Sequence, residues 1–217
     1  MITILLPSRG LIFSDTVQAL WREIKDFGDA DMDLVVITGK PIPEAQNKAV
    51  KEALKMPNNW LLFLEEDMIL PEGTFKALFK AVNEQKFDIA IINYPVGDHY
   101  STICRKDGQI LWFGLGCTLI HRHVFEELGK DNWFETDKSV KINNLATLDY
   151  EITDIPAKYG GHDILFGLKV AKRGLNIGEI TALQAGQYRL VELGRSEYNN
   201  GVHKIAKLEG INHFQEY

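Results

Sequence analysis

The stretch from residue 60 to residue 82 constrains the fold of this chain more than any other part of its sequence. It begins with five apolar residues, Trp60–Leu64 (WLLFL), directly behind two asparagines that favour a turn. An uninterrupted apolar run of this length is typical of a strand buried on both faces of a parallel sheet. Pro71 then fits the first turn of a helix. The apolar residues of that predicted helix share one face: Phe75, Leu78, Phe79 and Val82.

Three acidic residues, Glu65, Glu66 and Asp67, come directly after this predicted strand. Ligands of open α/β sheets bind outside the carboxyl ends of the strands, so these acids stand where a site is expected. Extended residues alternate sides, which places Glu65 and Asp67 on one side and Glu66 on the other. Two convergent carboxylates suit Mg²⁺ or Mn²⁺, and such a metal can hold a diphosphate. The alternative is an acidic turn that only stabilises the N-terminus of the next helix.

The bulk properties favour one ordinary globular domain. A chain of 217 residues can bury a substantial core, and a formal charge of −6 argues against general nucleic-acid binding. Cys104 and Cys117 are the only cysteines and form no close metal-ligand pair, which favours free thiols in a reducing compartment. The sequence shows no signal peptide and no apolar stretch long enough to cross a bilayer, so we expect a soluble, cytoplasmic protein.

Strands and helices alternate in the first hundred residues. Residues 2–6 predict a buried strand, followed by a tight loop at 7–10 and a helix that Asp15 can cap. The expected apolar face of this helix consists of Val17, Leu20, Trp21 and Ile24. A second strand at 33–37 and a helix starting at Pro43 follow. This alternation predicts a mainly parallel sheet, at whose edge the loops 7–10, 38–39 and 65–67 converge.

The pattern changes after a predicted strand at 88–92. Two short strands, 102–106 and 109–113, flank Asp107-Gly108, a dipeptide that favours a two-residue hairpin. Gly114 and Gly116 precede a strand at 117–120, and their missing side chains would admit either a ligand or a close structural contact.

A short helix that ends at Gly129 comes next, and residues 130–156 then predict a long polar loop. The aromatic residues of this loop, Trp133, Phe134 and Tyr150, could cover a sugar or anchor the loop to the core.

Asp163 stands at the predicted start of a late helix, after two glycines and His162. A carboxylate there can cap the helix, or it can accept a proton from an attacking hydroxyl group. Beyond Gly186 the pattern is irregular and contains cations that could close over a diphosphate or remain solvated: Arg189, Arg195, His203, Lys204 and Lys207. The chain contains no GxGxxG, Walker or GxSxG motif and no zinc signature, so dehydrogenase and common hydrolase functions lack support.

Five motifs in a consistent order carry a resemblance to the GT-A glycosyltransferases, particularly small members similar to family 2. They are PSRG at 7–10, AQNKAV at 45–50, LLFLEEDMILP at 61–71, FGLGCTLIHRHVFEEL at 113–128 and GGHDILFGLKVAKRGL at 160–175. The resemblance runs from residue 2 to about residue 180. It implies a single Rossmann-like α/β domain with a mixed, mainly parallel sheet flanked by helices and a small antiparallel hairpin.

The resemblance also implies roles for individual residues. In such enzymes a DxD-like element holds a divalent metal on the nucleotide diphosphate, which assigns Glu65 and Asp67, with Glu66 nearby. This chain departs from the pattern by having Glu at the first acid. The acidic pair before the late helix is replaced by His162-Asp163, of which Asp163 matches the catalytic base of inverting members. Some relatives add a histidine ligand from the carboxyl-terminal region. His203 and Gln187 are the two candidates for this ligand.

We therefore expect a Mn²⁺- or Mg²⁺-dependent glycosyltransferase that moves a sugar from a nucleotide-sugar, expected to be a UDP-sugar, to a hydroxyl acceptor with inversion. The nucleotide-binding residues would be Pro7, Ser8, Arg9, Thr38, Asn47, Lys48, Glu65 and Glu66. The metal ligands would be Asp67, Glu65 and His203, and the catalytic residues Asp163 and His162. The early helix has Gln46 where such enzymes frequently have Arg.

The expected domain spans residues 1–217. Residues 1–100 form its nucleotide-sugar-binding half, residues 101–185 its acceptor and catalytic half, and residues 186–217 a tail that closes over the site. A nucleotidyltransferase acting on a sugar phosphate and a noncatalytic sugar- or partner-binding domain of the same fold are the alternatives. The acceptor is open, and a nucleic-acid base is a minority candidate because of the acidic net charge.

Overall fold

A six-stranded sheet forms the centre of the computed structural model, which describes residues 1–28, 32–96, 100–129, 132–135, 138–156, 161–189 and 209–210. Its strands are β1 (Ile2–Ser8), β2 (Met32–Thr38), β3 (Trp60–Leu64), β5 (Ile89–Ile91), β10 (Cys117–His121) and β13 (Ile177–Glu179). They lie in the order β13-β5-β10-β3-β1-β2, and only β10 pairs antiparallel with its neighbours. The predicted fold class, a mixed and mainly parallel α/β sheet, is confirmed.

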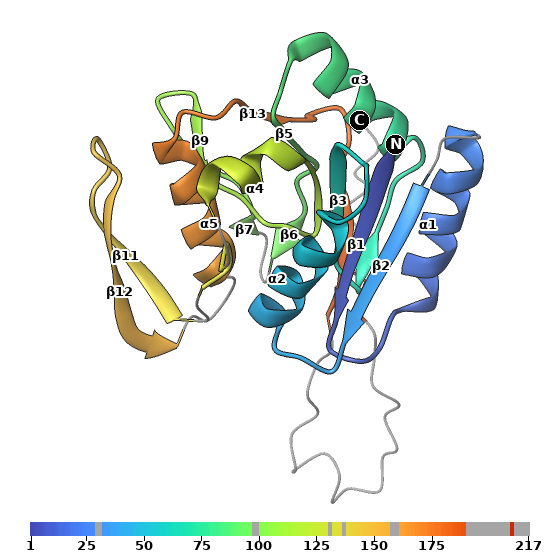
Figure 1. Ribbon diagram of the computed structural model, residues 1–217, viewed down its shortest axis with the longest axis horizontal. Coiled ribbons are helices and arrows are strands. Elements are labelled where there is room, and N and C mark those ends of the chain that lie inside the picture. Colours follow the sequence, from blue (N-terminus) through green and yellow to red (C-terminus); the bar gives the residue numbers. More distant parts are fainter. Residues whose placement is uncertain are drawn as a thin grey trace, which may run out of the picture.

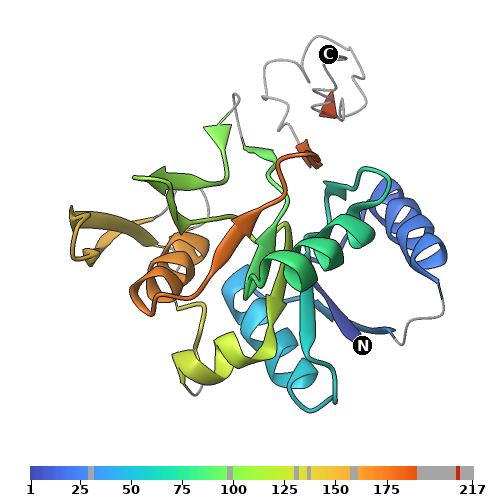
Figure 2. The same cartoon turned by 90° about the horizontal axis from the view of Figure 1, so that it is seen from above.

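In the described ranges, five helices cover the two faces of this sheet (Figures 1 and 2). On one face lie α1 (Ser14–Phe27) and α3 (Thr74–Gln85), whose apolar side chains pack with Ile4 and Leu62 in one core cluster. On the other face lie α2 (Ile42–Ala53), α4 (Arg122–Leu128) and α5 (Gly161–Lys172), which pack with Leu5 and Phe63 in a second cluster. Alternate residues of β1 and β3 thus enter opposite clusters, as expected for strands buried on both faces.

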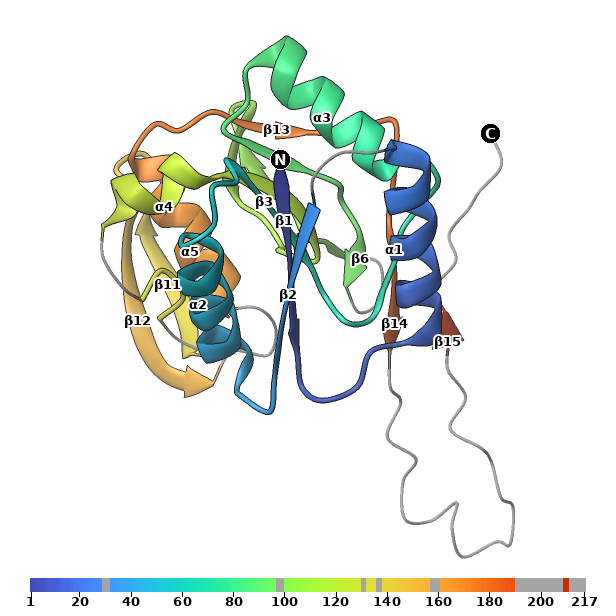
Figure 3. The ribbon, with the colours of Figure 1, turned by 45° about the vertical axis from the view of Figure 1, so that its right-hand side comes forward.

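Small antiparallel sheets lie outside this central sheet. The hairpin of β8 (Cys104–Lys106) and β9 (Gln109–Trp112) turns at Asp107 and Gly108, whose φ angles of 50° and 82° match the two-residue turn that the sequence predicts. The strand β4 (Met68–Ile69) pairs with β14 (Gly186–Arg189), which also pairs with β15 (Glu209–Gly210), as Figure 3 shows. Another pair is formed by β6 (Pro95–Val96) and β7 (Tyr100–Ser101).

The prediction of a long loop at 130–156 is wrong. Within it, β11 (Lys138–Asn144) and β12 (Asp149–Pro156) form a two-stranded ribbon beside α5 (Figure 1). Each strand has only a short apolar alternation, Val140 with Ile142 and Tyr150 with Ile152, among polar residues, and these side chains are exposed or half-buried, so the signal for a strand is weak. Trp133 and Phe134, in contrast, are buried among the aromatic residues of the core, which supports the anchoring alternative. The irregular tail predicted beyond Gly186 likewise begins with β14.

Three expectations about helix starts and faces are also wrong. The residue before α1 is Phe13, which makes no side-chain cap, and Asp15 lies inside the first turn. Of the predicted face of α1, Leu20 is buried and Ile24 packs against the core, but Val17 and Trp21 are exposed. Thr16, Ala19 and Glu23 complete the buried face.

Pro71 precedes α3 rather than occupying its first turn, since that helix begins at Thr74. The buried carboxylate of Glu23 accepts hydrogen bonds from the backbone N–H groups of Gly73 and Phe75, both at 3.0 Å. A side chain from α1 therefore satisfies the N-terminus of α3, a contact that local sequence cannot reveal.

Both cysteines are free thiols, and burial raises the pKa of Cys117 to about 12. Within the described ranges, no helix is long and apolar enough to cross a membrane.

Candidate functional site

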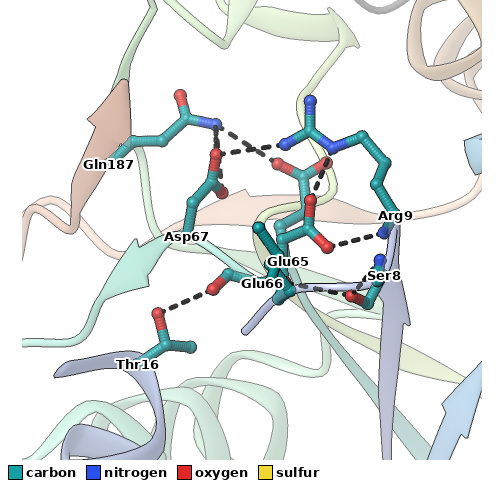
Figure 4. Close-up of polar contacts among 9 residues, drawn as sticks. Ser8, Arg9, Thr16, Glu65, Glu66, Asp67 and Gln187 are labelled. Carbon is teal, nitrogen blue, oxygen red and sulfur yellow. Dashed lines mark hydrogen bonds and ion pairs between the residues drawn. The ribbon is translucent and has the colours of Figure 1, made fainter. Parts of the chain in front are cut away.

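The loops that follow β1 and β3 are joined at the carboxyl edge of the sheet by Arg9 and Glu66 (Figure 4). The backbone N–H of Arg9 donates to Glu66 Oε2 at 2.6 Å, and its Nε donates to Oε1 at 2.5 Å. Partial burial opposes the charge of Arg9, but the hydrogen bond and the negative charge of Glu66 outweigh it and raise the pKa of Arg9. The backbone carbonyl of Glu66 also accepts hydrogen bonds from Thr16 Oγ1 and Phe13 N, both at 3.0 Å. Glu66 is thus held by three residues from the loop after β1 and the start of α1.

Glu65 and Asp67 face a different partner, Gln187 of β14 (Figure 4). Its amide nitrogen lies 3.5 Å from Glu65 Oε2 and 3.3 Å from Asp67 Oδ2. The pairing of β14 with β4, together with a 2.8 Å hydrogen bond from Tyr188 N to the Asp67 carbonyl, holds Gln187 over the two acids. Gln187 is thus one carboxyl-terminal candidate that lies at these acids, and the other candidate, His203, lies outside the described residues.

Asp163 approaches the same acids from the first turn of α5 and is 8% exposed. Its Oδ2 accepts a 3.4 Å hydrogen bond from Leu115 N, and its Oδ1 lies 3.1 Å from His162 Nε2. The same segment also contacts the backbone of Glu65, whose N–H donates to the Gly116 carbonyl at 3.1 Å. One short segment, 114–116, therefore bridges the end of β3 and the start of α5.

Tyr94 supports this bridging segment, and the sequence analysis did not identify it as a residue of the site. Its buried hydroxyl accepts a 2.9 Å hydrogen bond from Gly116 N. A Cβ atom on Gly114 would lie 2.3 Å from that hydroxyl, and one on Gly116 would lie 2.7 Å from both Met68 Sδ and the Tyr94 ring. The two glycines thus make room for Tyr94 and Met68. This is the close structural contact that the sequence analysis gave as the alternative to a ligand. The signal that could have identified Tyr94 is its position just beyond the end of the buried strand β5, because sites of α/β sheets lie at the carboxyl ends of strands.

The electrostatics of the site reflect several acids in a buried setting. Burial, followed by the negative charges of Asp163 and Asp67, raises the pKa of Glu65 well above its usual range. Burial also raises the pKa of Asp67, although the hydrogen bond from Gln187 and the charge of Arg9 oppose it. Burial and the charges of Glu65 and Asp163 raise the pKa of Tyr94. The site therefore favours a proton or another positive charge between its acids.

The other residues predicted to bind nucleotide lie in several environments. Pro7 and Ser8 end β1. The Ser8 hydroxyl donates a hydrogen bond to the Leu11 carbonyl and accepts one from Gly10 N, so both of these bonds lie within its own turn. Thr38 is exposed at the end of β2, and Lys48 is exposed on α2. Asn47 bonds the backbone of Phe134 with both its amide atoms, so the structure gives this side chain an anchoring contact. Gln46 is fully buried in α2.

The donor set at the sheet edge suits a hard divalent cation. Glu65 and Asp67 supply carboxylate oxygens, and Gln187 can present its carboxamide oxygen by a half-turn of the amide. In the described part of the chain, no group of three or more histidine, cysteine, aspartate or glutamate side chains is arranged to hold a metal ion. A metal here would thus need the carboxamide, water or substrate oxygens to complete its ligands.

The comparisons with known proteins define a fold rather than a family. No protein-family model matches the sequence, and no curated protein is similar to it. Among solved structures, A197 from STIV is similar with a TM-score of 0.57 and 17% identity, covering 88% of this chain and 86% of that one. A protein from Bacillus anthracis assigned as a glucose-1-phosphate thymidylyltransferase, solved with sucrose, has a TM-score of 0.43 and 10% identity. It covers 59% of this chain and 74% of its own.

Proposed function

We propose that this protein transfers a sugar from a nucleotide-sugar, of the UDP-sugar class, to a hydroxyl acceptor. The observation that carries the proposal is the meeting of Glu65, Asp67 and Asp163 at one sheet edge, although they come from two distant parts of the chain. The resemblance of the sequence motifs to GT-A glycosyltransferases supports the same function, and the α/β fold is compatible with it.

Glu65 and Asp67, with the Gln187 carboxamide, would hold Mn²⁺ or Mg²⁺ on the diphosphate of the donor. The metal would supply positive charge that stabilises the departing diphosphate. Arg9, whose side chain is mainly exposed and 3.7 Å from Asp67, is placed to contact the same anionic group. These residues bind and orient the leaving group.

Asp163 would accept the proton of the acceptor hydroxyl as that oxygen attacks the sugar. The hydrogen bond from Leu115 and the proximity of His162 Nε2 would hold its carboxylate in one orientation. Attack from the face opposite the diphosphate would invert the configuration of the sugar.

A thermal-shift panel tests this function without knowledge of the acceptor. The unmodified protein is titrated with UDP-sugars, other nucleotide-sugars and nucleoside triphosphates, each with Mn²⁺, Mg²⁺ or a chelator, because ligands that bind the native state raise its melting temperature. Metal-dependent stabilisation by a UDP-sugar is the expected result. Stabilisation by a triphosphate alone would favour the nucleotidyltransferase alternative, and binding without turnover would favour the noncatalytic one.

A further inference from the structure

The strand β2 forms one edge of the central sheet and lacks most of the features that prevent edge strands from pairing with a strand of another molecule. Its seven residues pair in regular parallel register with β1, and its other edge has no strand beside it among the described residues. Natural edge strands are usually short, charged, bulged or interrupted by proline. The strand β2 (MDLVVIT) has no lysine, proline or bulge, and its single charge, Asp33, already accepts a 2.8 Å hydrogen bond from Asn58.

Two apolar side chains of β2 remain exposed on the face that carries α1. Leu34 and Val36 lie beside Ile4 and Leu6 of β1, which point into the core cluster under α1. Neighbouring residues of paired strands point to the same face, so Leu34 and Val36 extend this apolar surface beyond the helix. They are nevertheless 52% and 42% exposed.

The flank of α1 contributes two more exposed apolar residues to the same region. Arg22 and Asp15 of α1 reach Leu70 and Tyr188, so that side of the helix faces β4 and β14. Val17 and Trp21 lie on the opposite side by helical rotation, which is the side toward β2, and they are 50% and 69% exposed. We call Val17, Trp21, Leu34 and Val36 the apolar edge surface, and it lies beside the edge of β2 that no other described strand pairs with.

We propose that β2 pairs antiparallel with β2 of a second copy of this chain, which joins two sheets into one continuous twelve-stranded sheet. Antiparallel pairing of a strand with itself creates a two-fold, self-complementary interface. With Val35 at the axis, Leu34 of one chain lies opposite Val36 of the other, so the two apolar edge surfaces meet. Asp33 then lies opposite Ile37 of the second copy, and no like charges face each other across the ladder.

The size and charge of this interface define how the dimer should behave. Stable interfaces bury roughly 800 Å² per partner, and one seven-residue ladder with four apolar side chains makes a small interface by comparison. We therefore expect a dissociation constant on the order of micromolar. Because each chain has a formal charge of −6, salt should screen the repulsion and tighten the dimer.

Sedimentation velocity of the full chain, between about 1 μM and 1 mM and at low and high salt, measures this equilibrium directly. The expected result is a monomer–dimer equilibrium that shifts toward dimer with salt and is abolished by Leu34→Lys. The matched control is Ile155→Lys, which makes the same change at another exposed apolar residue on β12 and should leave the dimer intact. A monomer at every concentration, or a dimer insensitive to Leu34→Lys, would overturn the proposal. If the protein is a monomer at every concentration, the edge of β2 would be a site for a different partner and not for a second copy of this chain.

Cross-linking tests the register separately. In a Cys104→Ser background, an equal mixture of Leu34→Cys and Val36→Cys chains should form intermolecular disulfides under mild oxidation more readily than either chain alone. Directly opposite residues are closer than the diagonal neighbours that each single variant would have to join. Equal cross-linking in all samples would contradict the proposed register. Neither experiment depends on the transferase function.

Discussion

Arg9 donates two hydrogen bonds to the carboxylate of Glu66, one from its backbone N–H and one from its Nε, at 2.6 and 2.5 Å. The Glu66 side chain is almost fully buried, whereas that of Arg9 is mainly exposed. The carboxylate therefore depends on Arg9 to compensate its burial, and the backbone N–H makes this compensation independent of where the arginine side chain moves. This contact gives Glu66 a structural role in joining two loops, beside the nucleotide contact that the sequence predicts for it.

We expect Glu66→Gln to lower the free energy of unfolding by about 1–3 kcal/mol, because charge-assisted hydrogen bonds at a buried group are lost. Urea denaturation measures the change. Glu52→Gln, which removes one exposed ion pair with Lys55, is the control and should leave the stability nearly unchanged. Equal effects of the two substitutions would contradict the structural role of Glu66.

The raised pKa of Glu65 makes the stability of the metal-free protein depend on pH. Burial and the charges of Asp163 and Asp67 raise this pKa above its value of 4.5 in an unperturbed chain, so the folded state binds more protons between these two values. The contribution of Glu65 to stability is therefore complete below pH 4.5 and is lost as the pH rises through the raised pKa.

Glu65→Gln cannot ionise, so its free energy of unfolding should exceed that of the unmodified protein increasingly as the pH rises. Each unit of pKa shift corresponds to about 1.4 kcal/mol. Denaturation in chelator at a series of pH values measures this difference, and Glu84→Gln, at an exposed position of α3, is the control. A difference that does not change with pH would rule out a raised pKa at Glu65.

Tyr94→Phe should destabilise the protein by about 1–3 kcal/mol, because Gly116 N would lose its acceptor in a buried place. Hydrogen exchange should also speed up at Gly116 and Leu115, since the hydroxyl holds the segment that bridges Glu65 and Asp163. Tyr150→Phe, on the partly exposed ribbon, serves as the control. Unchanged exchange at both amides would show that the bridge does not depend on the hydroxyl.

Asp163→Asn should reduce turnover roughly 100- to 10,000-fold while leaving donor binding nearly unchanged, because it removes the proposed base and preserves its shape. Turnover is measured once the donor panel has identified a nucleotide-sugar, and donor affinity is measured by calorimetry. Asp154→Asn, at a fully exposed carboxylate, should have no effect on either quantity. Full activity of Asp163→Asn would exclude Asp163 as the base.

Asp67→Ala should abolish the metal-dependent part of donor binding, and Gln187→Ala should weaken it by less, because a neutral carboxamide binds a divalent cation less strongly than a carboxylate does. The thermal shift with Mn²⁺ minus the shift with chelator reports this part. Gln85→Ala, at an exposed glutamine that ends α3, is the control for Gln187→Ala. Metal dependence that survives Asp67→Ala would remove Asp67 from the ligand set.

Some elements were predictable because their signals are local. The apolar run of β3 and the Asp107-Gly108 turn each depend on a few adjacent residues, and both were placed correctly. The ribbon of β11 and β12 was missed because the apolar alternation of each strand is limited to two residues within a mainly polar segment. The face of α1 was misplaced because the buried polar residues Thr16 and Glu23 find their partners in distant segments.

The sequence by itself determined which residues stand at the ends of the buried strands, since apolar runs and the residues that interrupt them are read along the chain. It thereby placed Glu65, Asp67 and Arg9 at one edge of a parallel sheet. Only the tertiary structure decided that Asp163 and Gln187 join these acids and that Tyr94 holds the bridge between them. It also decided that no other described strand pairs with the outer edge of β2. These contacts join segments far apart in the chain, so they depend on the order of strands in the sheet rather than on any local pattern.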